Sequence, residues 1–495
     1  MSFLNNLKKQ SNITYTENGA VTNASTFSDC LDLFYMAGAM RNADTTEISK
    51  AVVKSFAENR DLTMKILFFA RDIRGGLGER RFFRIAINTI AYLNIESARK
   101  NLKFIPEYGR WDDMLSLYDM KVQSDIINII KNQLEEDTKN MSENKEVSLL
   151  AKWLPSVNTS SNKTKALARK IASDLGMNEC TYRKTLSALR KYIDILESRL
   201  CNKDYSFDYS KQPSKAMLKY RKAFLRNDKE RYSAFLDSVA KGNSNLNTGT
   251  LYPYEIVRKI TGNHWSECVE MSDDEKKSLD VTWKALSNIE NVQNAIAVVD
   301  GSGSMYCGGN PSPADVALSL GIYFAEHNKG TFKNHFITFS MSPQLVEVKG
   351  NDIYEKVKYV SSFNECANTD IQAVFDLILK TAVKNKTPQE ELPETIYIIS
   401  DMEFDNCAMD GDKSFTNYET AKRKFEKKGY TLPNVVFWNV NARTQQVPVT
   451  MHESGTALVS GASPQIFDMV KSGNINPYAI MMDILSSERY ANITA

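Results

Sequence analysis

The sequence lacks a membrane-spanning run, a signal peptide and the usual cysteine and histidine spacings of zinc sites. No apolar stretch reaches the roughly 18–20 residues that cross a bilayer, and the N-terminus has no apolar core of a secretory signal. The seven cysteines show no C-x-x-C spacing and the four histidines no H-x-x-H spacing. These absences argue against a disulfide framework, a structural zinc site and a histidine-built metal site. We therefore expect a cytoplasmic protein with no membrane partner.

The net charge of +2 hides an uneven distribution. Residues 291–495 carry a net charge of −6, so residues 1–290 carry +8. The stretch 161–230 alone holds 17 basic and 8 acidic side chains. This asymmetry indicates a polyanionic partner for the first part of the chain only.

The first part of the chain has a helical pattern. At 495 residues the chain is too long for one hydrophobic core. Up to about residue 270, apolar residues recur at steps of three and four, which predicts successive short helices. Such a series is typical of a helical repeat, and we expect divergent HEAT-like pairing, with a single irregular helical domain as the alternative. The predicted helices cover 27–40, 46–58, 61–72, 80–93, 112–118, 124–135, 165–174, 181–198, 213–225, 229–240 and 253–260.

After about residue 285 short β-rich apolar runs alternate with amphipathic segments, which predicts a mostly parallel sheet covered by helices on both faces. The predicted strands are 294–300, 334–340, 394–401, 434–440 and 456–461, with 344–349 as an antiparallel edge, and the predicted helices are 313–327, 370–383, 416–428, 464–472 and 475–488. The sequence thus predicts a flexible segment over 1–24, an all-α domain over 25–285 and an α/β domain of Rossmann-like type over 286–495. The charged stretch 262–290 is the expected junction.

Hydroxyl and carboxylate residues follow the predicted strand ends. Asp300, Ser302 and Ser304 come directly after the first strand, Thr369 precedes a helix, and Asp401 ends a later strand. Ligands of open α/β sheets bind outside the carboxyl ends of the strands, and Mg²⁺ prefers oxygen ligands of these kinds. The pattern therefore predicts a site for a divalent cation, most simply Mg²⁺. Two alternatives are a helix start capped by a serine, and a site that keeps these residues without needing a metal.

The order D-x-S-x-S, then a threonine, then an aspartate resembles the metal-ion-dependent adhesion site of von Willebrand A domains. The resemblance implies that Ser302, Ser304 and Thr369 bind the ion directly, while Asp300 and Asp401 act through water. It also implies an open coordination position for an acidic group of a protein partner.

Other acidic residues lie close to this pattern in the sequence. We interpret Asp370 as the cap of the following helix. The remaining four acids, Glu403, Asp405, Asp410 and Asp412, are interpreted as a solvated loop, with tuning of the metal site as the alternative.

Basic residues gather in the helical part. Arg74, Arg80 and Arg81 surround a glycine turn that suits phosphate binding, although pairing with Asp72 and Glu79 is an equally good interpretation. Further basic side chains alternate with Tyr182, Tyr192, Tyr220 and Phe224, a pattern that suits either a phosphate backbone with stacked bases or a solvated helix face over core aromatics. The candidate RNA-binding residues are Arg74, Arg80, Arg81, Lys165, Arg169, Lys215, Lys219, Arg221 and Lys222.

Four motifs, at Arg74–Arg81, Tyr108–Leu115, Lys152–Ser156 and Tyr182–Arg190, resemble the family named domain of unknown function 2828. The layout is similar to that of the Ro autoantigen family, in which a TROVE module of HEAT-like helices forms a ring closed by a von Willebrand A domain. This resemblance implies a ribonucleoprotein component that binds small structured or single-stranded-ended RNA.

We therefore expect an RNA-binding protein whose von Willebrand A-type domain docks a partner and closes the ring. The alternative is a metal-dependent protein–protein adaptor with no nucleic acid role. We expect no catalytic activity, because no general base stands beside the metal residues and the histidines form no Ser-His-Asp order.

Overall fold

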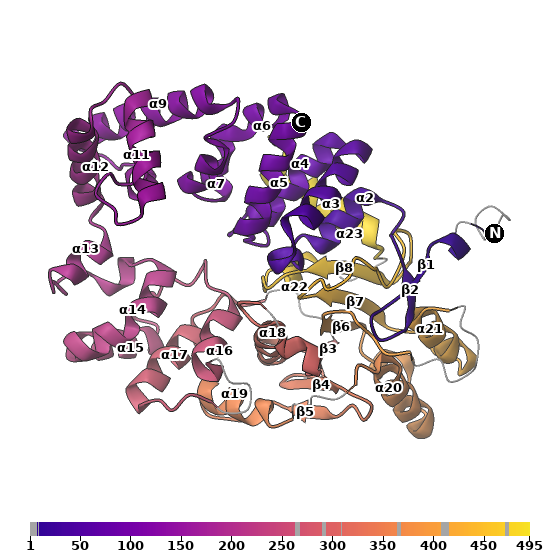
Figure 1. Ribbon diagram of the computed structural model, residues 1–495. Coiled ribbons are helices and arrows are strands. Elements are labelled where there is room, and N and C mark those ends of the chain that lie inside the picture. Colours follow the sequence, from indigo (N-terminus) through magenta and orange to yellow (C-terminus); the bar gives the residue numbers. More distant parts are fainter. Residues whose placement is uncertain are drawn as a thin grey trace.

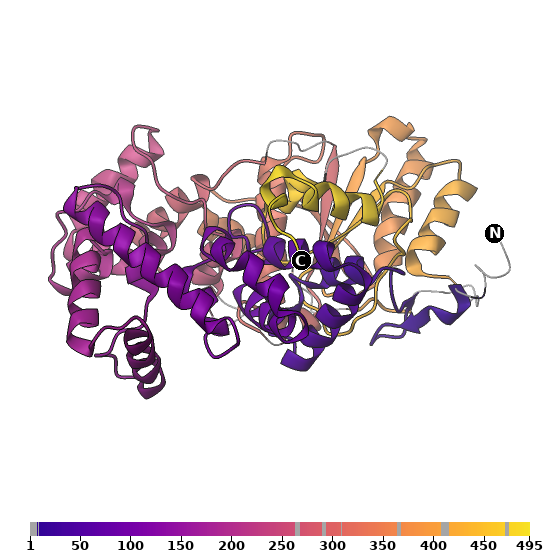
Figure 2. The ribbon, with the colours of Figure 1, turned by 90° about the horizontal axis from the view of Figure 1, so that it is seen from above.

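The structure is a computed structural model that describes residue 7 and residues 9–262, 268–289, 294–307, 309–363, 368–406, 415–470 and 475–495. Helices dominate its first part, and a parallel sheet with one antiparallel strand lies in its second part (Figure 1). Seen from above, the helices in the middle of the sequence form an arm that projects to one side of the sheet domain (Figure 2).

The helical part follows an antiparallel hairpin of β1 (Ile13–Tyr15) and β2 (Val21–Asn23). Its helices are short and pack mainly against neighbours along the chain. They are α2 (Asp29–Met36), α3 (Thr45–Glu58), α4 (Arg60–Arg71), α5 (Arg80–Leu93), α6 (Ile95–Asn101), α7 (Ile105–Tyr108), α8 (Trp111–Met114), α9 (Gln123–Ser142), α10 (Leu150–Trp153), α11 (Asn162–Asp174), α12 (Glu179–Ile193), α13 (Leu196–Cys201), α14 (Ser214–Asn227), α15 (Lys229–Ala240), α16 (Pro253–Thr261) and α17 (Asp273–Lys284).

Helices α6, α7 and α10 and the helix Ile353–Ser361 (α19) lie outside the predicted ranges, and two further elements differ from the prediction. Asp194 adopts the left-handed conformation (φ 55°), which ends α12 and separates it from α13 where one helix over 181–198 was predicted. The predicted junction 262–290 contains α17, which starts at a capping box formed by Ser272 and Glu275. The many charged residues of α17 obscured the apolar pattern of the residues that pack against α14 and α19.

The N-terminal segment also differs from the prediction of a flexible stretch over 1–24. Residues 13–23 form the hairpin, and Ala20, Val21, Thr22 and Asn23 are buried. Thr22 Oγ1 donates a hydrogen bond to the main-chain oxygen of Val447, 425 residues away (2.8 Å). A hydrogen-bond partner so far away in the sequence produces no local sequence pattern. The segment therefore looked only like a polar stretch.

The sheet has the strand order β5-β4-β3-β6-β7-β8, with β5 antiparallel at one edge. The predicted mostly parallel sheet and its antiparallel edge strand are therefore confirmed. The strands are β3 (Ala295–Asp300), β4 (His335–Phe339), β5 (Leu345–Glu347), β6 (Thr395–Ser400), β7 (Asn434–Asn439) and β8 (Thr456–Ser460), and the helices are α18 (Pro313–His327), α19 (Ile353–Ser361), α20 (Ile371–Asn385), α21 (Asn417–Lys427), α22 (Ile466–Met469) and α23 (Pro477–Leu485).

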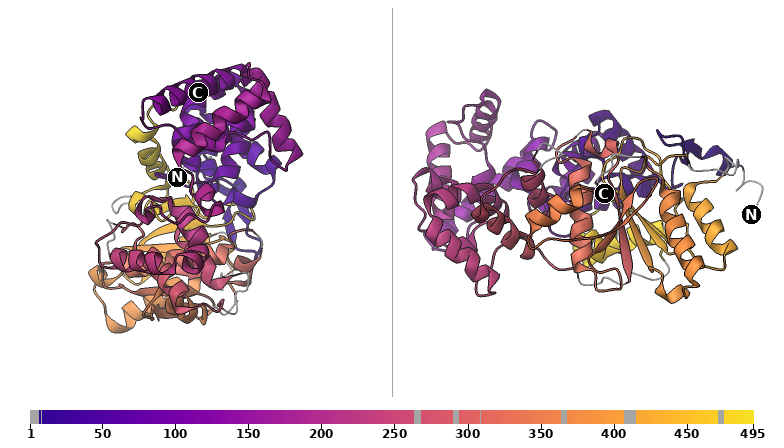
Figure 3. Two further views of the ribbon diagram at one scale, coloured as in Figure 1. Left: turned by 90° about the vertical axis from the view of Figure 1, so that its left-hand side faces the viewer. Right: turned by 90° about the horizontal axis from the view of Figure 1, so that it is seen from below.

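Helices cover both faces of this sheet (Figure 3). Neighbouring residues of a strand point to opposite faces. In β7 the ring of Phe437 meets Tyr418 of α21, whereas the next residue, Trp438, packs on Phe467 of α22. Both residues are buried, which explains why the strand reads as a continuous apolar run.

The helical part contacts the α/β domain at both of its ends. At the first end, the Gly38 nitrogen donates to Ser460 Oγ at the end of β8 (3.0 Å), and a Cβ on Gly38 would lie 2.6 Å from the Gly461 nitrogen. At the second end, Thr261 Oγ1 of α16 donates to Asp315 Oδ1 of α18 (2.8 Å). The chain thus leaves the sheet domain, passes through the arm and returns to it.

The buried apolar side chains form one large cluster that includes the sheet and most of the helices. A second cluster, which includes Phe224 and Tyr232, holds α13–α15 together in the arm. Among the described residues, no helix is long and apolar enough to span a membrane.

Candidate metal centre and basic surfaces

The five predicted metal-site residues lie around one edge of the sheet. The parallel strands β3 and β6 are neighbours, so Asp300 and Asp401 stand side by side at the carboxyl ends of the strands. Ser302 and Ser304 follow β3 on a loop and a 3₁₀ turn, and Thr369 precedes α20. Four of the five are buried, and Ser304 is partly exposed.

Asp300 is held by two donors. Its Oδ1 accepts from the Ser302 nitrogen (2.8 Å), and its Oδ2 accepts from Ser400 Oγ (2.6 Å). The side chain is buried, and burial together with the neighbouring Asp401 carboxylate raises the pKa of Asp300. Two carboxylates in one buried place therefore repel each other when both are ionised.

Asp401 has a buried oxygen without a hydrogen-bond partner. Its Oδ1 accepts from the Glu403 nitrogen (3.3 Å), whereas Oδ2 accepts no hydrogen bond and has Arg443 Nη1 at 3.7 Å. Burial raises the pKa of Asp401, against the opposing effects of the Ser304 hydroxyl and Arg443. A buried oxygen of this kind is costly unless something binds it.

The hydroxyls complete the oxygen set. Ser302 Oγ and Ser304 Oγ lie 3.0 Å apart, and the Ser302 side chain does not cap the turn that follows it. Thr369 Oγ1 donates to the Glu403 carbonyl (2.8 Å) and has Asp405 Oδ1 as a second acceptor at 3.1 Å. The alternative of a serine-capped helix start therefore does not describe Ser302.

These residues fit a hard divalent cation. Three hydroxyls and two carboxylates, one with a buried oxygen that accepts no hydrogen bond, are the donor set that Mg²⁺ takes together with water. Within the ranges that the structure describes, no three carboxylate, imidazole or thiol groups gather to hold a metal. Among the described residues, a metal in this region would therefore have to use the hydroxyls.

The sequence interpretation of the nearby acids needs one correction. Glu403 is buried rather than solvated: its carboxylate accepts from Thr444 Oγ1 (2.5 Å) and from the Glu17 nitrogen of the N-terminal hairpin (2.7 Å). Asp370 caps α20 as predicted, accepting from the Ala373 nitrogen (2.9 Å). Asp410 and Asp412 lie outside the described residues.

Sequence reasoning missed several groups that shape this site, namely Asn18, Ser400 and Arg443. Ser400 directly precedes Asp401 and could have been suspected as a polar residue that ends an apolar strand. Asn18 and Arg443 reach the site from distant parts of the chain and leave no local signal.

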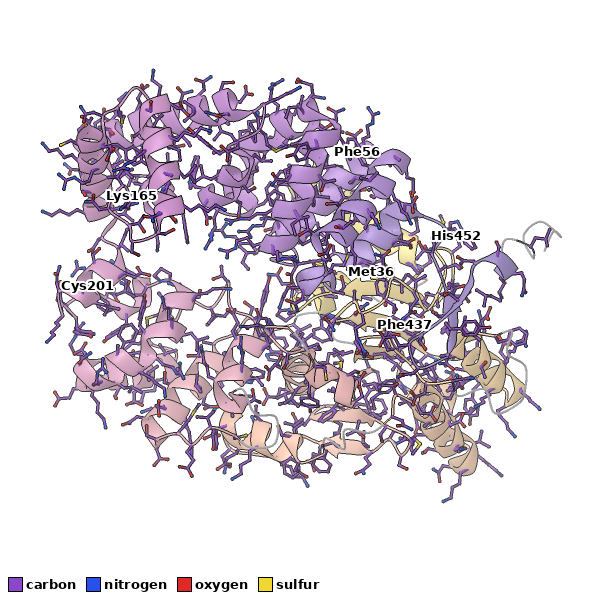
Figure 4. All side chains as sticks on the ribbon, viewed as in Figure 1. Met36, Phe56, Lys165, Cys201, Phe437 and His452 are labelled. Carbon is purple, nitrogen blue, oxygen red and sulfur yellow. The ribbon has the colours of Figure 1, made fainter. Side chains whose placement is uncertain are left out.

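The nine candidate RNA-binding residues lie in three separate places: the turn before α5, helix α11 and helix α14 (Figure 1). Figure 4 shows Lys165 of α11 in the arm, far from the sheet that holds Phe437. Arg74, Arg80 and Arg81 are exposed, and Arg81 donates to the Ala43 carbonyl (2.7 Å). The structure does not bring the nine residues into one patch.

The predicted pairing of the glycine-turn arginines is wrong. Asp72 and Glu79 are buried and bind Arg489 and Arg41, which come from elsewhere in the chain. From the sequence, the nearest arginines were the obvious ion-pair partners of Asp72 and Glu79. In the structure Arg74, Arg80 and Arg81 are exposed instead.

Three further residues are buried where an RNA contact was predicted. Arg221 is only 5% exposed, and its Nη1 donates to the Leu218 carbonyl (3.1 Å). Tyr182 and Phe224 are core residues, as the alternative interpretation had it. Lys215, Lys219 and Lys222 remain at the surface, and Lys215 and Lys222 form ion pairs with Glu255 and Glu275.

A basic pocket of about 310 Å³ lies where α14 and α16 meet the Asn310–Pro311 turn of the α/β domain. Lys215, Lys219, Arg258 and Lys259 line it, with Glu255 as the acidic residue of its lining. Burial and the nearby cations Arg221 and Arg258 lower the pKa of Lys259, so positive charge is in excess here. Arg258 and Lys259 escaped the sequence reasoning because they lie outside the basic stretch 161–230.

The fold and its sites define a two-part protein, with a helical region joined at both ends to an α/β domain that carries an oxygen-rich site. The chain belongs to the family described as domain of unknown function (DUF2828), whose family model matches residues 16–126 and 121–295. The resemblance found in the sequence is thus confirmed. A second family, domain of unknown function (DUF7788), matches residues 294–477.

Two individual proteins are similar along most of the chain. An uncharacterized protein of Acanthamoeba polyphaga mimivirus is 30% identical over 514 residues, which cover 96% of this chain and 87% of that protein. The crystal structure of the Ro (RSR) protein of Deinococcus radiodurans matches 93% of this chain and 100% of its own, with 12% identity and a TM-score of 0.37.

Proposed function

We propose that this protein binds RNA with its helical part, and that its α/β domain is a von Willebrand A-type module that binds Mg²⁺ to dock an acidic partner. The proposed RNA is small and structured, or has a single-stranded end. The helices are proposed to be a divergent HEAT-like series of Ro type that the α/β domain closes. The proposed role is binding rather than catalysis.

The buried Oδ2 of Asp401, which accepts no hydrogen bond and has Arg443 Nη1 at 3.7 Å, carries the metal part of the proposal. Ser302, Ser304 and Thr369 would hold the ion, with Asp300 and Asp401 supplying negative charge behind them. A bound Mg²⁺ would offset the repulsion between the two carboxylates and offer an open position to a carboxylate of a partner. Ser304, the partly exposed residue of the set, is where such a partner would approach.

The basic pocket carries the RNA part. Four cations around one acidic group attract phosphate, and Tyr254 in the pocket lining offers an aromatic ring close to them. A phosphate there would interact with both the helical part and the Asn310–Pro311 turn, which lies a few residues after Ser304. The RNA-binding pocket would then lie at the junction between the helical part and the metal-binding α/β domain.

The RNA proposal is tested by fluorescence anisotropy of the full chain with an RNA that has a single-stranded 3′ end. Replacing Lys215, Lys219 and Lys259 with Glu should weaken binding at least tenfold. The matched control replaces the exposed Lys380, Lys384 and Lys427 of the α/β domain with Glu, which changes the net charge equally. Equal affinities of the two variants would refute the pocket as the RNA site.

The alternative is a metal-dependent adaptor with no nucleic acid role, favoured by the ion pairs that already occupy Lys215 and Lys222. It predicts a protein partner that is lost on Asp300→Ala, together with an absorbance ratio of the purified complex that shows no nucleic acid. RNA in the complex that survives Asp300→Ala would instead support the two-part function.

A further inference from the structure

The N-terminal hairpin places a preformed turn against the candidate metal site. Thr16 and Ala20 close the turn between β1 and β2: the Thr16 nitrogen donates to the Ala20 carbonyl (2.9 Å), and the Ala20 nitrogen donates to Thr16 Oγ1 (2.9 Å). Gly19 has a φ of +83°, which a residue with a side chain rarely adopts. The tip, Glu17-Asn18-Gly19, is therefore fixed in shape before it meets the sheet.

The tip binds the main chain that follows β6. Thr16 Oγ1 donates to the Phe404 carbonyl (2.7 Å), the Glu17 nitrogen donates to the Glu403 carboxylate (2.7 Å), and Gly19 forms an antiparallel bridge with Asp405. These contacts surround the segment that directly follows the predicted metal residue Asp401. The other strand of the hairpin is held separately, through an antiparallel bridge between Asn23 and Val447.

Asn18 bridges this segment to Thr369. Its Nδ2 donates to the Glu403 carbonyl (2.7 Å) and to Thr369 Oγ1 (3.0 Å), so both protons of the amide have acceptors. Thr369 Oγ1 in turn has two acceptors within reach of its own proton, the Glu403 carbonyl (2.8 Å) and Asp405 Oδ1 (3.1 Å). The three groups form a closed triangle in which the threonine hydroxyl cannot rotate freely.

The triangle leaves the threonine oxygen one free lone pair. A hydroxyl has one proton and two lone pairs; here the proton goes to the Glu403 carbonyl or to Asp405 Oδ1 (3.1 Å), and in either case one lone pair receives the Asn18 amide. The second lone pair is available for a cation. Groups that orient a metal ligand in this way commonly change metal affinity by tenfold to a hundredfold.

We propose that Asn18 is a positioning residue of the metal site, so that the affinity for the ion depends on the N-terminal hairpin through the Thr369 hydroxyl. This inference rests on the proposed function, because it presumes that Thr369 binds the ion. It assigns to the first residues of the chain a part in a site whose other members all lie beyond residue 299.

The test is Mn²⁺ binding to the full chain, followed by the electron paramagnetic resonance signal of the free ion. Asn18→Ala should weaken Mn²⁺ binding about tenfold. Tyr15→Ser, on the exposed side of the same hairpin, is the matched control and should bind Mn²⁺ like the unmodified chain. The melting temperatures of the two variants without metal measure any general loss of structure, since Asn18→Ala also removes the hydrogen bond to the Glu403 carbonyl.

A double-mutant cycle separates positioning from a general loss of structure. If Asn18 acts through the Thr369 hydroxyl, Asn18→Ala should change Mn²⁺ affinity less than twofold in a Thr369→Ala background. A tenfold loss that persists in that background would overturn the inference, as would an Asn18→Ala variant that binds Mn²⁺ normally. Failure of the unmodified chain to bind Mn²⁺ or Mg²⁺ would instead refute the metal part of the proposed function.

Discussion

The guanidinium of Arg489 binds the buried carboxylate of Asp72 and so joins the C-terminal end of the chain to the turn after α4. Arg489 Nη2 donates to Asp72 Oδ1 (2.7 Å), and Tyr490 Oη donates to Oδ2 of the same carboxylate (3.1 Å). The Tyr108 hydroxyl donates to the Arg489 carbonyl from the other side. The Asp72 carboxylate therefore holds the C-terminal residues Arg489 and Tyr490 against the first helices.

Removing this carboxylate should loosen the junction. Asp72→Ala deletes charged hydrogen bonds but leaves Arg489 partly exposed and able to regain water, so we expect a loss of about 2–3 kcal/mol. Thermal melting and limited proteolysis of the C-terminal residues measure it. The control is Glu96→Ala in the exposed pair with Arg99, where we expect almost no change in melting temperature. Equal effects of the two changes would show that the Asp72 contact is not a structural junction.

The contact between α2 and β8 leaves no room for a side chain at Gly38. A Cβ there would lie 2.6 Å from the Gly461 nitrogen, so Gly38→Ala should destabilise the protein by about 1–3 kcal/mol. Gly249→Ala is the control, because nothing lies within 4 Å of its added Cβ, and it should leave the melting temperature unchanged. A Gly38→Ala variant that melts like the Gly249→Ala variant would contradict the close packing of the two parts.

Much of the fold could be predicted from the sequence because local patterns record it. Buried strands such as 395–400 read as apolar runs bounded by polar residues, and the antiparallel edge strand followed from its closeness to β4. Helix α17 could not be predicted, since its apolar residues are outnumbered by charged ones that face solvent.

The candidate metal site was predictable only where its residues follow strand ends. Asp300, Ser302 and Ser304 form one local motif, and Asp401 ends an apolar run, so their positions follow from the sheet. Asn18 and the basic pocket arise from contacts between segments hundreds of residues apart or on different domains, and Arg443 contacts Asp401 from 42 residues further along the chain. No periodicity or spacing in one sequence encodes such contacts.

Salt dependence should distinguish the basic pocket from a nonspecific charge effect. If three lysines of the pocket contact phosphates of single-stranded RNA, replacing Lys215, Lys219 and Lys259 with Glu should reduce the slope of log affinity against log salt by about 2. The measurement is anisotropy at several KCl concentrations. A slope that stays unchanged while affinity falls would mean that these lysines act on structure rather than on the RNA.

Neutralising Asp401 should stabilise the protein when no metal is present. Asp300 and Asp401 are buried together, and burial raises the pKa of both, so ionising both costs free energy. In EDTA at pH 8, Asp401→Asn should raise the melting temperature by a few degrees, because the variant removes a buried charge whose Oδ2 accepts no hydrogen bond. A fall in melting temperature would indicate that the carboxylate is already stabilised by groups such as Arg443.

The thermal response to Mg²⁺ tests the metal site most directly. With Mg²⁺ at a hundred times its Kd, the bound ion should stabilise the unmodified chain by about 2.7 kcal/mol and raise its melting temperature. Asp401→Asn should melt at the same temperature in Mg²⁺ as in EDTA. An unmodified chain that does not respond to Mg²⁺, or a variant that responds equally, would contradict a divalent cation held by Asp300, Ser302, Ser304, Thr369 and Asp401.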